Sequence, residues 1–301
     1  MSSLKEIKGR IASVRNTQKI TSAMRMVASA KLHHTQGMTE AFLRYKDELE
    51  KIVKTLSHNG EGDHPDGSPL YGGDVRQDKE DIKSILLIPV SSNSGLCGAF
   101  NSNIAKATLQ RIHELESQGK NVRLLPIGKK IAHELKKANK DFNADFVPLL
   151  EKIEKSNTLT AVSALVEMAC EWHQAQEIER IEFLYHHFKS MGHQVITIDS
   201  LQLPDDRSMR QEENPISTYL TEPSPQELRT SLSPRLLNAQ VYGILLDSLT
   251  SEHAARMLAM QTADDNANDL LKELTLLYNK TRQQAITNEL IDIMGGKAGQ
   301  N

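Results

Sequence analysis

Aromatic residues and cysteines are the classes that this 301-residue sequence uses least. Phe, Trp and Tyr make up 4% of the chain, against 39% for all hydrophobic residues, so the apolar content is mainly aliphatic. This mixture favours packing of helices on helices over the large core of an enzyme. The two cysteines, Cys97 and Cys170, lie far apart and lack CxxC spacing. That pattern fits a reducing compartment and gives no disulfide framework.

Long apolar runs are also missing. No stretch approaches the roughly 20 residues that cross a bilayer, and the N-terminus lacks the apolar segment of a secretory signal. We therefore expect a soluble, cytoplasmic chain without a membrane span. The net charge of −3, from 36 basic and 39 acidic residues, favours neither an anionic nor a cationic partner.

Glycine and proline are absent from two long stretches, 10–36 and 244–294. A helix over the second stretch would be roughly 75 Å long at about 1.5 Å per residue. Apolar and small residues recur in each stretch at alternating steps of three and four, which marks a coiled-coil seam. The sequence predicts two long terminal helices that pack as an antiparallel coiled coil. The expected seam residues are Leu4, Ile7, Ile11, Val14, Gln18 and Thr21, and Met260, Ala263, Ala267, Leu270, Leu274, Leu277 and Thr281.

The middle of the chain alternates strands with helices. A short, continuous apolar run at 85–90 reads as a buried strand. Alternating strands and helices favour a small sheet of mainly parallel order, here with a final antiparallel pair that turns at Met191 and Gly192. Further strands are expected at 122–127, 178–188 and 194–198, and helices at 104–115, up to Lys137 and at 158–173.

The chain therefore predicts an α/β fold in which a Rossmann-like domain is inserted between two coiled-coil helices. The expected bounds are 1–58 for the first helix, 59–80 for a linker, 81–203 for the α/β domain, 204–223 for a second linker and 224–301 for the last helix. Ser224 and Pro225 supply a cap and a first-turn proline. Pro234 is expected to kink or restart that helix near Ser233.

A glycine turn after the first strand raises the question of a phosphate site. The dinucleotide fingerprint needs three glycines, and only Gly95 and Gly98 are present. Gly128 and Lys129 lack the upstream glycine and the following Ser or Thr of a Walker loop. A tight structural turn is the better interpretation, with Cys97 a packed residue. We expect no catalytic residue and no cofactor.

The histidines do not form a recognisable metal site. His186 and His187 are adjacent on a strand and so point to opposite faces, while His193 lies across the turn. His33 and His34 are adjacent on a helix. No cysteine lies near either group to complete a tetrahedral zinc site, so we expect no metal.

The N-terminal helix is strongly basic. A single acid, Glu6, stands among seven basic residues in positions 1–31. Such a surface fits nucleic acid, a membrane surface or an acidic protein, or it is a solvated face without a partner. The basic residues are Lys5, Lys8, Arg10, Arg15, Lys19, Arg25 and Lys31.

Both ends of the chain resemble the gamma subunit of bacterial F-type ATP synthases. The resemblance rests on 11–21 and 23–28 in the first helix, on 251–257, and on matches between 270 and 290. The glycine turn at 95–98, together with Asn101, matches the sequence motif that follows the first strand in this family. Asn93 and Ser94 depart from it, because an acid and a base usually stand there. The cysteine-bearing regulatory insert of chloroplast versions is absent.

The resemblance implies a non-catalytic central rotor that binds no nucleotide. In the family, the paired helices thread a ring of three alpha and three beta subunits, and the α/β domain docks on the epsilon subunit and the membrane ring of c subunits. Proton-driven rotation is coupled to ATP synthesis at the cytoplasmic face of the bacterial inner membrane. The basic helix then faces acidic loops of beta. The resemblance implies partner contacts at Met24, Arg25, Arg282, Gln283, Thr287 and Glu289.

Two other functions remain as alternatives. An enzyme built on the α/β domain, for example a nucleotide-dependent one, would need a complete phosphate loop. A coiled-coil adaptor or nucleic-acid binder would use the basic helix, but the sequence shows no recognisable binding module and the last helix is rich in acids.

Overall fold

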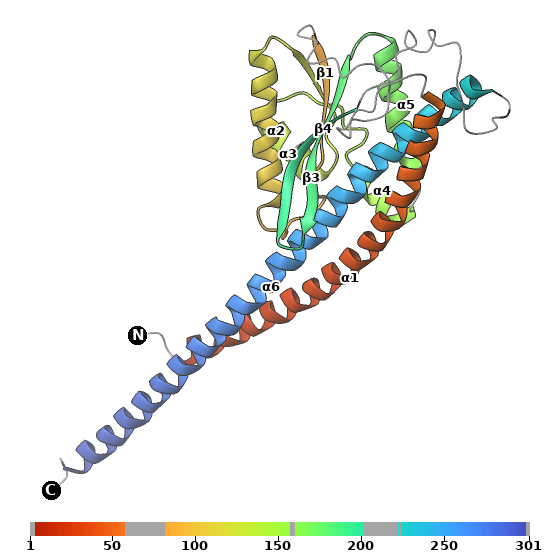
Figure 1. The fold of residues 1–301 in the computed structure, drawn as a ribbon. Coiled ribbons are helices and arrows are strands. Elements are labelled where there is room, and N and C mark those ends of the chain that lie inside the picture. Colours follow the sequence, from red (N-terminus) through yellow and green to blue (C-terminus); the bar gives the residue numbers. More distant parts are fainter. Residues whose placement is uncertain (1–3, 58–81, 157–159, 202–221, 223, 299–301) are drawn as a thin grey trace. The chain divides into compact units, whose positions relative to one another are not determined.

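The computed structural model describes residues 4–57, 82–156, 160–201, 222 and 224–298 (Figure 1). The first three residues of the expected N-terminal helix and nearly all of the predicted linkers, 59–80 and 204–223, lie outside these residues. The elements are α1 (Leu4–Ser57), β1 (Ser84–Pro89), α2 (Phe100–Ser117), β2 (Asn121–Leu124), α3 (Lys129–Lys137), α4 (Leu149–Ser156), α5 (Thr160–Gln174), β3 (Arg180–Ser190), β4 (His193–Leu201) and α6 (Pro225–Ala298).

The chain divides into two compact units, and α1 and α6 contribute to both. The first unit combines residues 1–30 with 256–301, and the second comprises residues 31–255. The five domain bounds expected from the sequence stay a prediction.

The second unit contains a four-stranded mixed sheet in the order β2-β1-β3-β4. β1 pairs in parallel with β2 and β3, and β3 pairs antiparallel with β4 around the expected turn. The predicted mainly parallel sheet with a final antiparallel pair is confirmed. β2 ends at Leu124, earlier than expected, although Ile127 still forms an isolated bridge with Val90.

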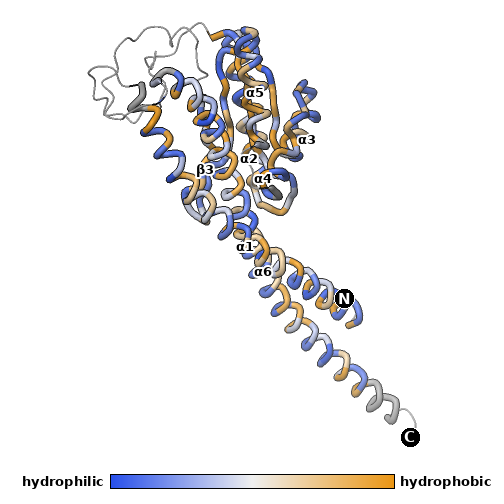
Figure 2. Tube along the Cα trace, turned by 90° about the vertical axis from the view of Figure 1, so that its right-hand side faces the viewer, coloured by the Kyte–Doolittle hydropathy of each residue, from blue (hydrophilic) through white to orange (hydrophobic). Residues whose placement is uncertain are grey.

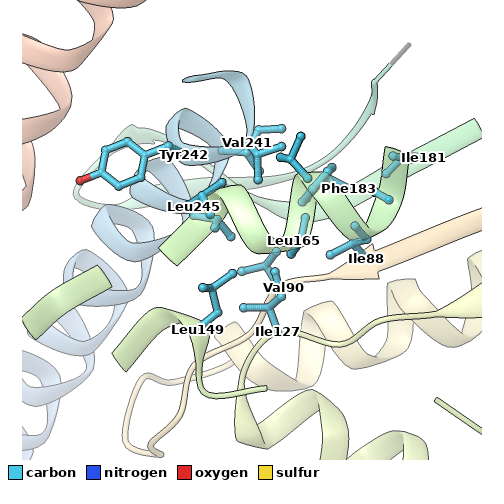
Figure 3. Packing of buried hydrophobic residues seen from close by; sticks show 14 of the residues in the cluster. Ile88, Val90, Ile127, Leu149, Leu165, Ile181, Phe183, Val241, Tyr242 and Leu245 are labelled. Carbon is cyan, nitrogen blue, oxygen red and sulfur yellow. The ribbon is translucent and has the colours of Figure 1, made fainter. Parts of the chain in front are cut away.

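Alternate residues of the central strands face two different helical layers. Leu86 and Ile88 of β1 join the core formed with α4, α5 and α6, whereas Leu87 joins the core formed with α2 and α3. Phe183 and Leu184 divide in the same way on β3. Figure 3 shows the first of these cores, in which side chains of the sheet meet those of α4, α5 and α6. The sheet is therefore covered on both faces, as parallel strands require.

Helix α4 was not predicted from the sequence. It buries Leu149, Leu150 and Ile153 almost completely in the core. The helix has eight residues, too few for a periodic pattern to stand out, and isolated helices of that length are unstable without packing.

Within the second unit, α1 packs directly against α6. Leu49 and Val53 of α1 form a buried cluster with Leu236 and Ala239 of α6. Phe42 meets Tyr242 edge-on, with ring centroids 4.8 Å apart, an arrangement that the ring quadrupole favours.

Pro234 does not restart the last helix, which was one of the two effects expected of it. Helix α6 begins at Pro225 and runs through Pro234 to Ala298. Proline removes one backbone donor but keeps a helical φ. Packing of the buried Leu236 and Leu237 in the following turn holds the helix there.

In the first unit, the seam of α6 differs by one residue from the predicted positions. Met260, Ala267 and Leu274 are buried as expected. Leu270 and Leu277, however, are 43% and 44% exposed, while the adjacent Leu271 and Tyr278 are half-buried. Side chains at neighbouring helical positions point about 100° apart around the helix axis. Where two adjacent residues are both apolar, contact with the partner helix therefore decides which of them is buried in the seam.

A buried carboxylate joins the sheet to α2. Glu182 on β3 is fully buried, and Arg111 of α2 donates to it from Nε at 3.0 Å and from Nη2 at 2.9 Å. The bond from Arg111 to this carboxylate raises the pKa of the guanidinium. Arg180 approaches the same carboxylate at 3.5 Å.

His186 occupies the same face of β3 and stays uncharged. Its ring stacks on Phe100 at the start of α2, with centroids 4.1 Å apart. Burial lowers the pKa of His186 from its usual 6.5 to about 4. His187 is exposed on the other face, as the alternation of a strand requires.

We expect Arg111→Met to destabilise the second unit by about 3–5 kcal/mol, because it leaves a buried charge without its main partner. The double change Arg111→Met with Glu182→Leu removes both charges and should cost much less. Denaturant unfolding of the two variants measures the difference. A double variant as unstable as the single one would contradict this account.

We expect the buried His186 to make stability depend on pH. The unfolded chain takes up a proton below about pH 6.5, and the folded chain does so only below about pH 4. The free energy of unfolding should therefore fall by up to about 3 kcal/mol as the pH drops from 6.5 to 4. His186→Gln should flatten that slope in urea titrations. The matched change His113→Gln, at an exposed site on α2, should leave it unchanged, and equal slopes in both variants would refute the assignment.

Candidate functional site

The two helices of the first unit are held in antiparallel register by side-chain bonds. Gln18 Nε2 donates to Asn268 Oδ1 at 2.6 Å, and Arg25 donates to Gln261 Oε1. Both bonds fit a single alignment of the two helices, because Gln18 and Arg25 are seven residues apart on α1 and their partners are seven residues apart on α6. Two heptads further along, Leu4 comes level with about Arg282.

Helix α6 continues well beyond the start of α1, as Figure 2 shows for the ends marked N and C. In this register, residues 283–298 face no residue of the described part of α1. Ile286, Leu290 and Ile291 are 45%, 55% and 60% exposed there. Clustered apolar residues on a single helix indicate a surface that a partner covers.

Four of the predicted contact residues lie at this end of α6. Arg282, Gln283, Thr287 and Glu289 are all exposed. The Thr287 hydroxyl already donates to the Gln283 carbonyl at 2.9 Å, within the helix. Arg282 and Glu289 share a face with Ile286, since they lie four and three residues from it. The segment thus combines apolar and hydrogen-bonding groups on one side.

Met24 and Arg25, the other predicted contact residues, are half-buried. Arg25 is bound to Gln261, whose own amide donates to Asp265 at 3.0 Å. Arg25 therefore already has a partner on α6 within the helix pair.

Sequence reasoning missed three exposed apolar residues on α1. Ile20, Met26 and Val27 are each more than half exposed. Their signal was present, because they are large apolar residues that lie off the predicted seam. The basic residues Lys5 to Lys19 are exposed too, so this helix presents a mixed cationic and apolar surface.

The residues between β1 and the glycine turn are hydrogen-bonded to the start of helix α3. Asn93 Oδ1 accepts a bond from the Lys129 backbone N–H at 3.0 Å, and Ser91 Oγ accepts one from Ile131 N–H at 2.9 Å. The Ser92 carbonyl accepts from Lys130 N–H at 3.2 Å. The loop after β1 thus caps helix α3, whose amides a phosphate would otherwise use.

Gly128 and Cys97 have structural roles in the same region. Gly128 has φ 103°, and a Cβ there would lie 2.1 Å from the Ser91 carbonyl oxygen. The Cys97 side chain is buried and accepts a bond from the Asn101 amide at 3.1 Å. The close backbone contact explains the glycine, and burial agrees with the interpretation of Cys97 as a packed residue.

In the described parts of the chain, no group of three or more His, Cys, Asp or Glu residues is arranged to hold a metal ion. Across those same residues, every helix is too short or too polar to traverse a bilayer.

The chain is similar along its whole length to known proteins. The ATP synthase family model matches residues 3–299. The ATP synthase gamma chain of Parabacteroides distasonis is 48% identical over 299 residues, which is 99% of each chain. That of Trichlorobacter lovleyi is 35% identical over 98% of each chain.

Solved structures share the fold at lower identity. A chain of the Euglena gracilis mitochondrial ATP synthase, in an assembly of OSCP, F1 and c-ring, superposes with a TM-score of 0.64 at 19% identity, over 98% of this chain and 94% of that one. A chain of the Tetrahymena thermophila central stalk and c-ring gives a TM-score of 0.53 at 22% identity, over 81% and 99%. The chain belongs to the ATP synthase gamma-chain family, the non-catalytic rotor subunits of the central stalk.

Proposed function

We propose that this chain turns inside a ring of three alpha and three beta subunits, and that its α/β domain docks on the epsilon subunit and the c-subunit ring. It works peripherally at the cytoplasmic face of the bacterial inner membrane, where it couples proton-driven rotation to ATP synthesis. The observation that carries the proposal is the end of α6, which extends past α1 with exposed apolar and hydrogen-bonding residues.

The surface of the helix pair suits a rotor because its apolar and charged residues are unevenly distributed. The exposed apolar residues Ile20, Met26 and Val27 stand beside a cationic face on α1. A partner can shift a conformational equilibrium only through a difference in its contacts with the two states. A uniform surface would offer each beta subunit the same contacts in every orientation, whereas an uneven one favours a different beta conformation in each.

The cationic face of α1 fits acidic loops on the beta subunits. Lys5, Lys8 and Arg15 are exposed and point away from the apolar seam. Charge complementarity of this kind raises the association rate and excludes wrong partners more than it adds affinity. Nucleic acid is the less suitable partner, because the described chain contains no recognised nucleic-acid-binding module.

The partners are tested by purifying the tagged full-length chain from a membrane extract in mild detergent. We expect alpha, beta, epsilon and c subunits to be recovered with it. Recovery of the chain with nucleic acid, or with none of these subunits, would refute the proposal.

We expect Arg282→Ala with Gln283→Ala to weaken binding to the alpha–beta ring. Both side chains are exposed and off the seam, so the helicity and thermal unfolding of the free chain should not change. A desolvated arginine contact is worth about 1 kcal/mol or more, which corresponds to about fivefold in affinity. Affinity for the ring and ATPase activity of the reconstituted complex are the readouts.

The matched control for that pair is Glu48→Ala with Lys51→Ala, an exposed ion pair on α1 in the second unit. It should keep wild-type assembly and turnover. Equal behaviour of the two double variants would show that Arg282 and Gln283 form a solvated face.

We also expect the isolated chain to hydrolyse no ATP and to bind nucleotide weakly at best. The backbone amides at the start of α3 are already bonded to Ser91, Ser92 and Asn93. Calorimetric titration with ATP and a phosphate-release assay measure both properties. Hydrolysis that disappears in Lys129→Ala would overturn this expectation.

A further inference from the structure

A short polar stretch of α6, residues 247–254, is enclosed by the second unit. Seven consecutive residues, from Ser248 to Ala254, are buried. Seven residues make nearly two turns, so the helix is covered on every side at this level. A helix buried all round is normally apolar, yet this one carries Ser248, Thr250, Ser251, Glu252 and His253.

Three bonds join this polar stretch to the end of strand β3. Asp247 accepts from the Phe188 backbone N–H at 2.9 Å, and its other oxygen lies 2.5 Å from His187 Nδ1. One turn later, the Ser251 hydroxyl donates to the His186 carbonyl at 2.9 Å. Three consecutive residues of β3 are thus bound to two positions on one side of α6.

The other sides of the stretch are bound to α4 and α1. His253 Nε2 lies 3.2 Å from a Glu154 oxygen on α4, and Lys31 of α1 lies 3.5 Å from the same oxygen. The His253 bond lowers the pKa of Glu154, so this carboxylate stays charged. The hydroxyl oxygens of Thr39 and Thr250 are 3.4 Å apart. Three elements therefore contact α6 at one level.

Directional bonds restrain a helix differently from apolar contacts. The hydrophobic effect is non-directional, so apolar side chains tolerate a small rotation of the helix with little change in buried area. Hydrogen bonds weaken steeply as their angles depart from linear, and a buried polar group that loses its partner bears its full desolvation cost. Rotation of α6 against β3 and α4 would strain all of these bonds together.

We propose that residues 247–254 form the torsional lock between the α/β domain and α6, through which torque applied to the domain reaches the helix. This inference rests on the proposed rotor function and adds to it the site at which torque passes from the domain to the helix. Asp247 and Ser251 are positioning residues in this lock, since they act by holding β3 in place.

The test measures the torsional stiffness of the full-length chain in a reconstituted alpha–beta ring. The ring is fixed to a surface, and a bead is attached to the α/β domain through Met191→Cys, at the exposed turn between β3 and β4, in a Cys170→Ser background. Without ATP, the angular variance of the bead reports stiffness. We expect Asp247→Ala with Ser251→Ala to increase that variance at least about twofold, since both attachments to β3 are lost.

The matched control is Asp269→Ala with Thr275→Ala, which changes the same helix at exposed positions whose bonds are local to α6. It should keep the wild-type variance. A wild-type variance in the Asp247 and Ser251 variant overturns the lock. If that variant does not fold, Ser251→Ala alone is measured, and an unchanged variance overturns the lock equally.

Rotation of the bead after ATP is added tests the proposed rotor function independently of the lock. On adding ATP, the bead on the wild-type chain should rotate. Failure of the wild-type bead to rotate would count against the proposed function whatever the variance shows, whereas rotation with unchanged variance in the variant would count against the lock alone.

Discussion

The need of a long helix to bury its apolar stripe governs this structure. A helix of 54 residues and one of 74 cannot each find enough apolar surface on a small domain, so they bury it on one another. Their register follows from that pairing, with Gln18 beside Asn268. Beyond the start of α1 the requirement is no longer met, and Ile286 and Leu290 remain exposed. The far end of the longer helix therefore keeps apolar side chains exposed that the helix pair itself does not cover.

The α/β domain has a topology that often binds ligands, but its own residues occupy one of the usual binding positions. In parallel sheets, ligands commonly bind beyond the carboxyl ends of the strands, where helices begin. Here that position is filled by the chain itself, because Asn93 and Ser91 cap α3 and the Gly128 backbone lies against Ser91. The first backbone amides of α3, which a phosphate would use, are thus bonded within the chain. This agrees with membership of a family of non-catalytic subunits.

Buried and half-buried polar pairs supply the fixed geometry that an aliphatic core does not. Glu182 with Arg111 fixes α2 on one face of the sheet, while Asp247 with the β3 backbone fixes α6 where that strand ends. Each bond contributes little net stability, but breaking one leaves a buried group unsatisfied. A rotor subunit gains from this property, because its parts must keep their orientation under load.

The sequence by itself determined the two long helices, the inserted sheet with its final antiparallel pair, and the absence of a complete phosphate loop. These follow from local patterns such as apolar periodicity, continuous apolar strands and glycine spacing. Only the tertiary structure decided that Leu271 rather than Leu270 faces the seam, that α6 runs through Pro234, and that 149–156 is helical. It also decided that Arg25 is bound to Gln261 while Arg282 is exposed. The physical reason is the same in each case: local pattern leaves two states of similar energy, and contact with a segment distant in sequence selects between them.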